Sequence, residues 1–286
     1  MTVRDALLGL GALALLLTAC ERDTPAAPAP GERAPALNRV VSLSPLATRF
    51  VLAIGARSRL VAADAVSAQR PELAGLPTVD LRSAADLSPD LVLVPENPEP
   101  GDPAALALHR RGARIAEFAP HDFEDALALV RGVGTELAGP AQASRFEADF
   151  SRPLAQIGGD SHGQPRPRVV ALVSAAPLVI AGGHSFETDL IEIAGGTSVT
   201  HPGNESRLAI DADRWRELAP DLVLVIGAPP ASPRDEQALR NALPHGAEVA
   251  FFAFDPSFWL DASDEPARRL RAVIEPLSAR LAQRAR

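Results

Sequence analysis

The residues whose types are best suited to catalysis lie in the segment 179–187, which reads VIAGGHSFE. An apolar run, a glycine turn, a serine and then a helical pattern are similar to the strand–turn–helix motif that exposes a nucleophilic serine in hydrolases. That motif has a second glycine two positions after the serine, where turn and helix pack closely. Glu187 occupies this position here. Ser185 therefore remains the nucleophile only of an alternative, hydrolytic function, with no other catalytic residues assigned.

The same segment offers a histidine. Neutral imidazole is a common metal ligand, so His184 could contact the metal of a bound ligand, together with His201. The six His residues show no tight spacing of the kind that metal sites use. A solvated His184 without a role is the alternative, and the sequence predicts neither a resident metal ion nor an intrinsic cofactor.

The composition excludes several functional classes. The 286 residues include 36 acidic and 28 basic ones, all of the latter Arg, and the net charge is −8. Such a protein lacks the basic surface that nucleic acids require, so we expect no nucleic-acid partner. A single Cys excludes an intrachain disulfide, and the lack of Lys excludes a phosphate loop ending in lysine. A hydrophobic fraction of 47% is sufficient for a folded core.

The first residues indicate export. Residues 6–18 are apolar or small, a stretch shorter than the ~20 residues that span a bilayer. It ends in Leu-Thr-Ala-Cys, which resembles the lipobox of bacterial lipoproteins, where cleavage precedes a Cys that becomes lipidated. We expect a lipoprotein signal peptide at 1–19, then the lipidated Cys20 and a Pro/Ala-rich tether at 20–37. A buried N-terminal helix with an incidental Cys is the alternative.

Two stretches of the sequence occur twice in the same order. Arg-Val-Val begins at residues 39 and 168, which are 129 positions apart. Pro-Asp-Leu-Val-Leu-Val begins at residues 89 and 220, which are 131 positions apart. This period is too long for a solenoid repeat and indicates a duplicated domain. We expect an N-terminal lobe at 38–139 and a C-terminal lobe at 166–286.

The apolar pattern predicts the fold class. Continuous runs of Val, Leu and Ile between turn residues are typical of strands buried on both faces of a parallel sheet. Because these runs alternate with helical patterns, we predict an α/β fold of two similar βαβ lobes with parallel sheets. The expected strands are 39–44, 60–63, 91–94, 114–118, 168–174, 223–226 and 248–254.

The connection between the lobes is predicted to be helical. The pattern favours a last helix of the first lobe at 122–137, and Pro140 suits the first turn of a new helix. Large apolar residues then recur every four positions, at Phe146, Phe150 and Leu154. We assign 140–165 to one long bridging helix and a linker. A continuous helix has no hinge in its middle, so we expect only modest movement of the lobes.

An ordered set of motifs resembles one protein family. The motifs are VSLSPLAT at 41–48, the glycine at 55, LSPDLVL at 87–93 and AGG at 194–196. With the lipobox and tether, they are similar to the Fe/B12-type periplasmic binding proteins, and the match covers most of residues 38–286. The resemblance implies two lobes around a helical backbone, and a receptor rather than an enzyme. Such a receptor captures a corrinoid or a ferric siderophore and delivers it to an ABC-type importer.

The expected ligand contacts come from two sources. Ligands of parallel α/β sheets bind at loops beyond the carboxyl ends of the strands. These loops contain Ser44, Pro45 and Leu46 in the first lobe, and Ala176, Pro177, Gly182, Gly183, His184 and Ser185 in the second. The resemblance adds Phe258 and Trp259, in a segment similar to the family's late cleft loop. The core is the alternative location for Trp259. The family's cobalamin receptor also packs Tyr on the corrin, and this chain has no Tyr.

The resemblance also implies a docking surface for the permease. The family places one carboxylate in each lobe, eight residues before the Asp of the Pro-Asp motif, opposite Arg residues of the permease. Asp213 satisfies this in the second lobe, whereas Arg82 stands at the matching position of the first. Like charges at an interface can cost several kcal/mol. Asp80 or Asp86 could substitute for the missing carboxylate.

Together these observations predict a monomeric, membrane-anchored lipoprotein of the periplasm or cell surface. It would capture a metal chelate for an ABC importer and contact the membrane through its lipid alone. A degenerate receptor that serves as a sensor or scaffold is the alternative, which Arg82 and the low aromatic content favour. The serine hydrolase is the lower alternative.

Overall fold

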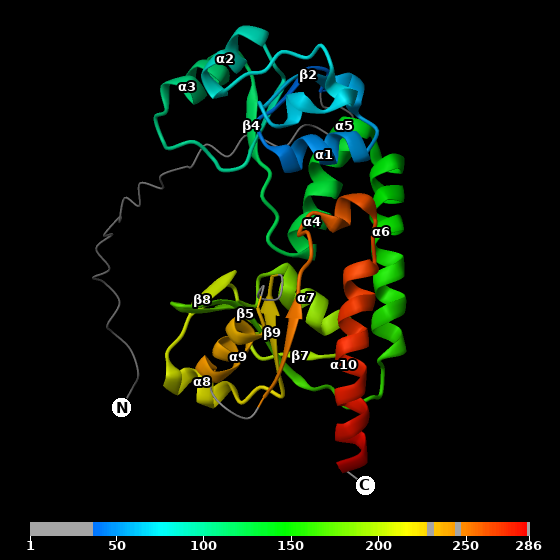
Figure 1. Cartoon of the computed structure of the whole chain (residues 1–286). Helices are drawn as coiled ribbons and strands as arrows, with labels where there is room; N and C mark the ends of the chain where they lie inside the picture. The colour runs from blue at the N-terminus through cyan, green and yellow to red at the C-terminus, as the bar shows by residue number, and fades with distance from the viewer. Residues whose placement is uncertain (1–36, 228–231, 244–246, 285–286) are drawn as a thin grey trace, which may run out of the picture. The chain divides into compact units, whose positions relative to one another are not determined.

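The computed structural model describes residues 37–227, 232–243 and 247–284 (Figure 1). Its first sheet has four parallel strands in the order β2-β1-β3-β4. They are β1 (Val40–Ser42), β2 (Leu60–Ala63), β3 (Leu91–Val94) and β4 (Arg114–Glu117), each within a predicted strand. The central strands β1 and β3 are buried along their whole length, as expected for a sheet covered on both faces. This sheet and its helices form the first lobe.

The sheet of the second lobe is mixed. Its order is β10-β9-β5-β6-β8, with β7 beside β5. The strands are β5 (Arg168–Ala175), β6 (Leu178–Ala181), β7 (Thr197–Ser198), β8 (Arg207–Ala209), β9 (Leu222–Ile226) and β10 (Glu248–Phe252). The prediction of a parallel sheet holds for β5, β7, β9 and β10 and is wrong for β6 and β8. The reason is a two-residue turn, Ala176-Pro177, which reverses the chain into a hairpin after β5.

Helices connect the strands and cover the sheets. The α-helices are α1 (Pro45–Ala53), α2 (Leu81–Ala84), α3 (Pro103–Arg110), α4 (Phe123–Leu129), α5 (Thr135–Ala138), α6 (Pro140–Asp160), α7 (Phe186–Ile193), α8 (Ala212–Leu218), α9 (Pro233–Ala242) and α10 (Glu265–Arg284). Short 3-10 turns are η1 (Arg57–Arg59), η2 (Ser67–Gln69), η3 (Pro71–Leu73), η4 (Ala85–Leu87) and η6 (Phe258–Asp261). A π-helical turn, η5 (Val130–Gly134), lies between α4 and α5.

Corresponding helices of the two lobes begin and end alike. Ser44 caps α1 by accepting a hydrogen bond from Ala47 N at 3.3 Å, and Ser185 caps α7 by accepting one from Thr188 N at the same distance. Each helix is followed by glycine in the left-handed region, Gly55 at φ 79° and Gly195 at φ 93°. Only glycine adopts this conformation without strain, so the sequence marks both helix ends.

The duplication seen in the sequence is also present in the contacts. The Asp90 carboxylate accepts a hydrogen bond from the backbone N–H of Arg39 at 2.9 Å. In the second lobe the Asp221 carboxylate accepts one from Arg168 N–H at 2.7 Å. Both guanidinium groups also donate to backbone carbonyls just before the repeated Pro-Asp pair. The two matching stretches therefore hold together corresponding strands, β1 with β3 and β5 with β9.

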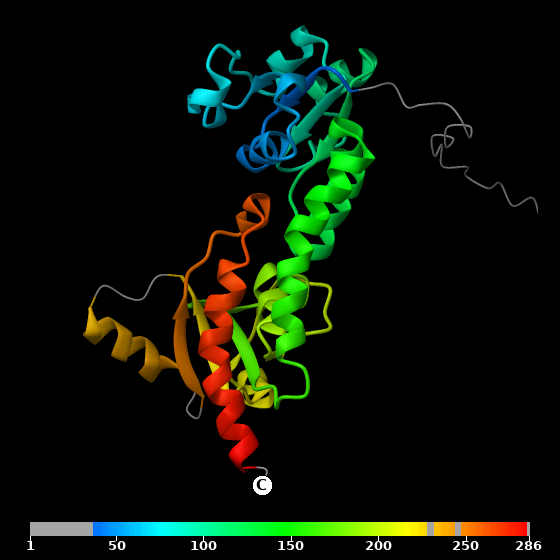
Figure 2. The same cartoon turned by 90° about the vertical axis from the view of Figure 1, so that its right-hand side faces the viewer.

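The link between the lobes is helical, as predicted. α4, η5 and α5 form one stretch over 123–138, and Gly139 at φ 88° separates it from α6. α6 is 21 residues long and reaches Asp160. It buries Phe150 and Leu154 and lies alongside α10, as Figure 2 shows.

The chain returns to the first lobe near its C-terminus. η6 contacts α1 (Figure 2), although it follows the last strand of the second lobe. Arg49 of α1 forms ion pairs with Asp255 at 3.2 Å and with Asp261 at 3.0 Å. A side-chain hydrogen bond from Ser257, together with Arg49, holds the pKa of Asp255 below its usual range. These contacts join the two lobes at a second place, apart from α6.

Within the described ranges, no helix combines the length and apolarity that crossing a membrane requires. The predicted signal peptide at 1–19, the lipidation site Cys20 and the tether up to residue 36 lie outside those ranges.

Candidate functional site

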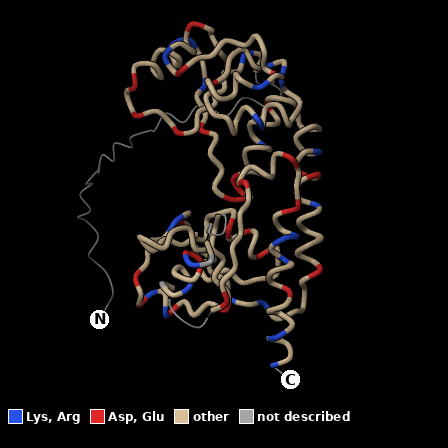
Figure 3. Tube along the Cα trace, in the orientation of Figure 1, with Lys and Arg blue, Asp and Glu red and all other residues tan. Residues whose placement is uncertain are grey.

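A polar cavity lies where the loop between β6 and α7 meets the segment that leads into α4. Its volume is about 460 Å³. The lining residues are Asp122, Glu124, Asp125, Gly183, His184, Asp189, His201, Pro202, Gly203 and Asn204. They include four carboxylates and two imidazoles, and none of these lining residues is Arg. Figure 3 shows acidic residues gathered at the start of α4. Such a lining attracts cations and repels anionic groups.

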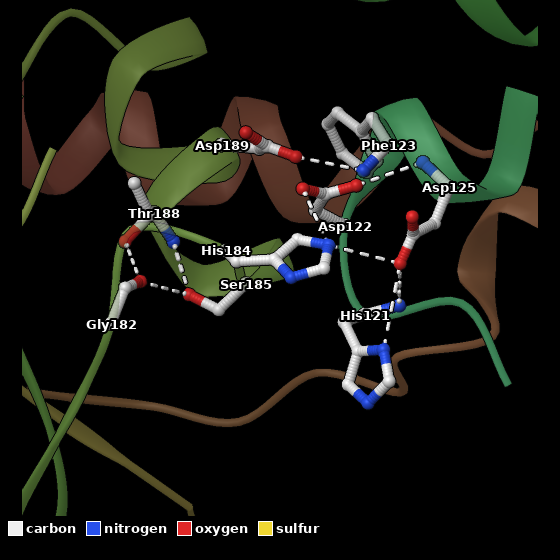
Figure 4. Close-up of polar contacts among 9 residues, drawn as sticks. All are labelled: His121, Asp122, Phe123, Asp125, Gly182, His184, Ser185, Thr188 and Asp189. Carbon is white, nitrogen blue, oxygen red and sulfur yellow. Dashed lines mark hydrogen bonds and ion pairs between the residues drawn. The ribbon is translucent and has the colours of Figure 1, made fainter. Parts of the chain in front are cut away.

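His184 occupies the centre of this arrangement (Figure 4). Its Nε2 atom lies 3.0 Å from a carboxylate oxygen of Asp125 and 3.2 Å from one of Asp122. The Asp122 side chain is only 14% exposed. The His184 backbone N–H donates to the Glu205 carbonyl at 3.1 Å, which fixes the loop that carries the imidazole. The structure thus places His184, a candidate site residue from the sequence, beside two carboxylates to which the sequence assigned no role.

His121 extends the cluster. Its Nδ1 atom lies 3.5 Å from the Asp125 carboxylate, and its ring centroid lies 5.4 Å from that of His184. One nitrogen or oxygen each from His121, Asp125 and His184 lie within 4.8 Å of one another. His201, which the sequence suggested as a partner of His184, lines the cavity but is not part of this group. Imidazole and carboxylate together are a donor set for divalent transition metals.

Asp189 lies on the inner side of the cavity. Its carboxylate accepts a hydrogen bond from Phe123 N at 2.8 Å. Burial, and then the nearby negative charge of Asp122, raise its pKa to about 6, although the Phe123 hydrogen bond and two histidines, His184 and His201, oppose the shift. Asp189 is therefore an acid that changes its charge close to neutral pH.

The glycines before His184 are required by close packing. A Cβ atom on Gly182 would lie 2.0 Å from the Glu205 carbonyl oxygen, and one on Gly183 would lie 2.3 Å from Gly203 N. Either contact is impossible without a backbone shift. The prediction that this loop lies beyond the carboxyl end of a parallel strand is wrong, because β6 is antiparallel. The loop instead lies against residues 121–125 of the first lobe.

Ser185 has a structural role. It is 1% exposed, donates its hydroxyl hydrogen to the Gly182 carbonyl at 2.8 Å and caps α7. No imidazole among the described residues contacts this hydroxyl. Glu187 forms an ion pair with Arg207 at 2.9 Å and is itself 7% exposed. The arrangement gives the serine neither a general base nor access to a substrate.

The predicted ligand residues of the first lobe lie elsewhere. Ser44 is buried at the start of α1, Pro45 is exposed, and Leu46 is half-buried against the core. None of the three lines the polar cavity. The structure therefore does not bring Ser44, Pro45 and Leu46 together with His184, and their contact with a ligand stays a prediction.

Trp259 lies in the core. It has no exposed surface and packs on Phe50, Phe118, Phe146 and Phe150, with ring centroids 6.0–6.5 Å away. This supports the core alternative for Trp259. Its Nε1–H has no acceptor among the described residues.

Phe258 is 5% exposed and lines a separate hollow of about 430 Å³ that also includes Phe254 and Arg269. It is therefore not part of the polar cavity. Its contact with a ligand stays a prediction.

The predicted docking residues are both exposed. Asp213 lies in the first turn of α8, pairs with Arg216, and has a side chain that is 79% exposed. Arg82 lies on α2, two residues after the helix cap Asp80. A side-chain hydrogen bond from Ser83 lowers the pKa of Asp80, so this carboxyl is charged beside Arg82. The first lobe thus presents both signs of charge where the family has one carboxylate.

Sequence reasoning missed the acidic half of the cavity. Asp122, Asp125 and His121 were within or next to a predicted helix but had no assigned role. Their signal was local: His121 and Asp125 are four residues apart, and Asp122 caps α4 by accepting a hydrogen bond from Asp125 N at 2.8 Å. Only the tertiary fold brings this segment to His184, which is 59 residues from Asp125.

Known proteins with similar sequences or folds include some that are named as binding proteins for vitamin B12 or heme. No protein-family model matches the chain. A vitamin B12-binding protein of Pectobacterium carotovorum is 23% identical over 199 residues, which are 67% of this chain and 72% of that protein. A periplasmic heme-binding protein of Pseudomonas aeruginosa has a TM-score of 0.57 at 21% identity, over 85% of this chain and 94% of that one. A periplasmic heme-binding protein of Vibrio cholerae has a TM-score of 0.61 at 19% identity, over 82% and 98%.

These likenesses confirm the α/β fold predicted from the apolar pattern, and they agree with the family resemblance of the sequence motifs. The similar proteins are binding proteins by name, not enzymes. The chain resembles periplasmic binding proteins of the Fe/B12 type in its fold.

Proposed function

We propose that this protein is the substrate-binding component of an ABC-type importer and that it works in the periplasm. The observation that carries the proposal is the duplicated α/β fold around α6, shared with receptors named for B12 and heme. Ligand capture and delivery require no chemistry from the protein, which agrees with the buried, capping role of Ser185.

The proposed ligand is a corrinoid or another metal chelate, such as a ferric siderophore, held between the lobes. The loop 44–46 of the first lobe and His184 of the second are the proposed contacts, whereas the buried Ser185 caps α7. A Cys20 lipid anchor and docking through Asp213 belong to the same proposal. The protein acts as a monomer and carries no intrinsic cofactor.

A ligand screen tests the proposal. The purified protein is heated with cobalamin, hemin or a ferric siderophore, each in large excess. A ligand at 100 times its dissociation constant adds about 2.7 kcal/mol to the free energy of unfolding, which a thermal-shift assay detects. One chelate class should stabilise the protein, and the stoichiometry by calorimetry should be one. If none of the three classes raises the melting temperature, the proposed ligand class is wrong.

A second function deserves a test because of Arg82. A receptor that has become a sensor or scaffold would bind a chelate without docking on a permease. Co-purification with the permease subunits separates the two, since only an importer component should retain them. A hydrolase is not proposed, because Ser185 is buried and no imidazole of the described residues contacts its hydroxyl.

A further inference from the structure

The cluster around His184 has more carboxylate oxygens than imidazole hydrogens that could bond to them. Nε2 of His184 carries at most one hydrogen, yet it faces carboxylate oxygens of Asp122 and Asp125 at 3.2 and 3.0 Å. The Asp125 oxygen also faces Nδ1 of His121 at 3.5 Å. One ligand atom each from His121, Asp125 and His184 thus lies within 4.8 Å of the others, and the Asp122 carboxylate lies beside His184. A cation there would balance the negative charge of the carboxylates.

The separations match those between the ligands of one metal ion. Zn²⁺ binds imidazole nitrogen and carboxylate oxygen at about 2.0–2.2 Å in tetrahedral geometry, which places neighbouring ligand atoms roughly 3.3 Å apart. The three measured separations, 3.0, 3.2 and 3.5 Å, lie around that value. The carboxylates of Asp122 and Asp125, both next to His184, also suit a positively charged ion.

The surroundings favour a free ion over other cations. None of the residues described as lining the cavity is Arg, so no side-chain cation there competes for the carboxylates. A metal already held in a macrocycle offers at most two axial positions. Three protein groups within 4.8 Å of one another, by contrast, suit an ion that is not held in a macrocycle. Imidazole ligands disfavour Mg²⁺ and Ca²⁺, which prefer oxygen.

The ligand groups are held in place before any ion binds. The other carboxylate oxygen of Asp122 accepts a hydrogen bond from Asp125 N at 2.8 Å. The His121 carbonyl accepts one from Phe186 N at 2.8 Å. The tightly packed Gly182 and Gly183 fix the loop that carries His184. Such prior ordering lowers the entropy cost of binding.

We propose that His121, Asp125 and His184, with the Asp122 carboxylate beside His184, form a binding site for one divalent first-row transition-metal ion such as Zn²⁺. His121 and Asp125 belong to the first lobe and His184 to the second, so the ion links the lobes beside α6. The proposal does not depend on the ligand class of the proposed function.

Metal titration of the full-length protein tests the site. After treatment with EDTA and its removal, Zn²⁺ should bind with a stoichiometry of one by calorimetry and raise the melting temperature. Co²⁺ should bind at the same site and give the intense visible absorption of a tetrahedral complex. Mg²⁺ at the same concentration should do neither.

Variants assign the binding to these residues. His121→Ala and His184→Ala should each weaken Zn²⁺ binding at least tenfold and abolish the Co²⁺ absorption. His109→Ala removes an exposed histidine of α3 and serves as the matched control, which should bind like the wild type. If His184→Ala does not fold, His121→Ala decides the question, because its ring is half-exposed and its loss leaves no cavity.

Three results would overturn the proposal. The first is no binding of Zn²⁺ or Co²⁺ by the wild type, and the second is unchanged binding in His121→Ala. The third is heme absorption that shifts in the wild type but not in His184→Ala, without any binding of free Zn²⁺. That result would make the imidazole an axial ligand of a chelate.

Discussion

The carboxylate of Asp189 accepts a hydrogen bond from the backbone N–H of Phe123 at 2.8 Å, across the boundary between the lobes. In the same place Phe186 N donates to the His121 carbonyl at 2.8 Å. The starts of α4 and α7 are therefore joined in both directions. Because Asp189 is largely buried and close to Asp122, the junction contains a carboxyl group whose pKa is about 6.

This carboxyl group should make the stability of the protein depend on pH. Well below pH 3.8, Asp189 is protonated in both the folded and the unfolded state. Between its ordinary pKa of 3.8 and its folded pKa of about 6, the folded state binds more protons, so stability falls as pH rises. The loss is complete above pH ~6 and is of the order of 3 kcal/mol. Asp189→Asn, which keeps an acceptor for Phe123, should remove this loss and be more stable than the wild type at pH 7.5.

Urea unfolding from pH 4 to pH 8 measures the effect. Asp149→Asn changes the same charge at an exposed position on α6 and is the control. If wild type and Asp189→Asn show parallel pH profiles, ionisation of Asp189 does not lower the free energy of unfolding and the prediction is wrong.

Trp259 should be important for stability. Trp259→Ala removes the ring that Phe50 and Phe118 pack against, and truncation of a buried Trp costs about 3–5 kcal/mol. Trp259→Phe keeps an aromatic ring and removes an N–H that has no acceptor among the described residues, so it should cost clearly less. Chemical denaturation gives both values. A stable Trp259→Phe variant with weakened chelate binding would show that the indole contacts the ligand instead.

Ligand binding should change the lobe arrangement only slightly. α6 runs without a break through 21 residues, and Arg49 joins α1 to the segment containing Asp255 and Asp261. X-ray scattering curves of the free and the chelate-bound protein should nearly superimpose. A large decrease in the radius of gyration on binding would contradict this and would require a hinge elsewhere.

Asp213 should act in docking and not in ligand capture. Asp213→Ala should leave the chelate dissociation constant within a few fold and reduce permease-dependent uptake, whereas Asp149→Ala on α6 should change neither. Arg82→Glu should strengthen docking if the permease presents Arg to both lobes. Charge pairs at interfaces have couplings of about 1.5–7 kcal/mol, although desolvation can cancel them. Loss of docking in Arg82→Glu would mean that the permease presents an acidic partner to Arg82.

Cys20 should determine where the protein is held. Cys20→Ser removes the thiol that the lipobox presents, so the variant should lack the lipid and keep its signal peptide or be released. Fractionation and gel migration distinguish it from the lipidated protein. Identical fractionation of the two proteins would exclude Cys20 as the anchor.

The sequence was sufficient for most strands because their signal is local. Residues 91–94 are four consecutive aliphatic residues, and all are buried in β3. The direction of β6 was not predictable in this way. It depends on whether two residues, Ala176 and Pro177, are enough to turn the chain, and on the partner that the strand then finds. The apolar run of β6 indicates a buried strand but does not show that it pairs antiparallel with β5.

The polar cavity was even less predictable from local sequence patterns. His184 was recognised as a candidate by its type and loop, but its carboxylate partners come from the other lobe. Trp259 illustrates the opposite error: its motif suggested a cleft, and only the fold reveals the phenylalanines that enclose it. One sequence indicates which residues could react, whereas their distances depend on the packing of both lobes.

The return of η6 to α1 has a consequence for biosynthesis. The ring of Trp259 completes the aromatic packing around Phe50 and Phe118, more than 130 residues earlier in the chain. Domains commonly fold in order as they leave the ribosome. Here the first lobe cannot reach its final packing until the second has been almost fully translated. A nascent chain halted at the boundary between the repeats would lack Trp259 in the core of its first lobe. The two halves, although duplicated, therefore complete their folding together.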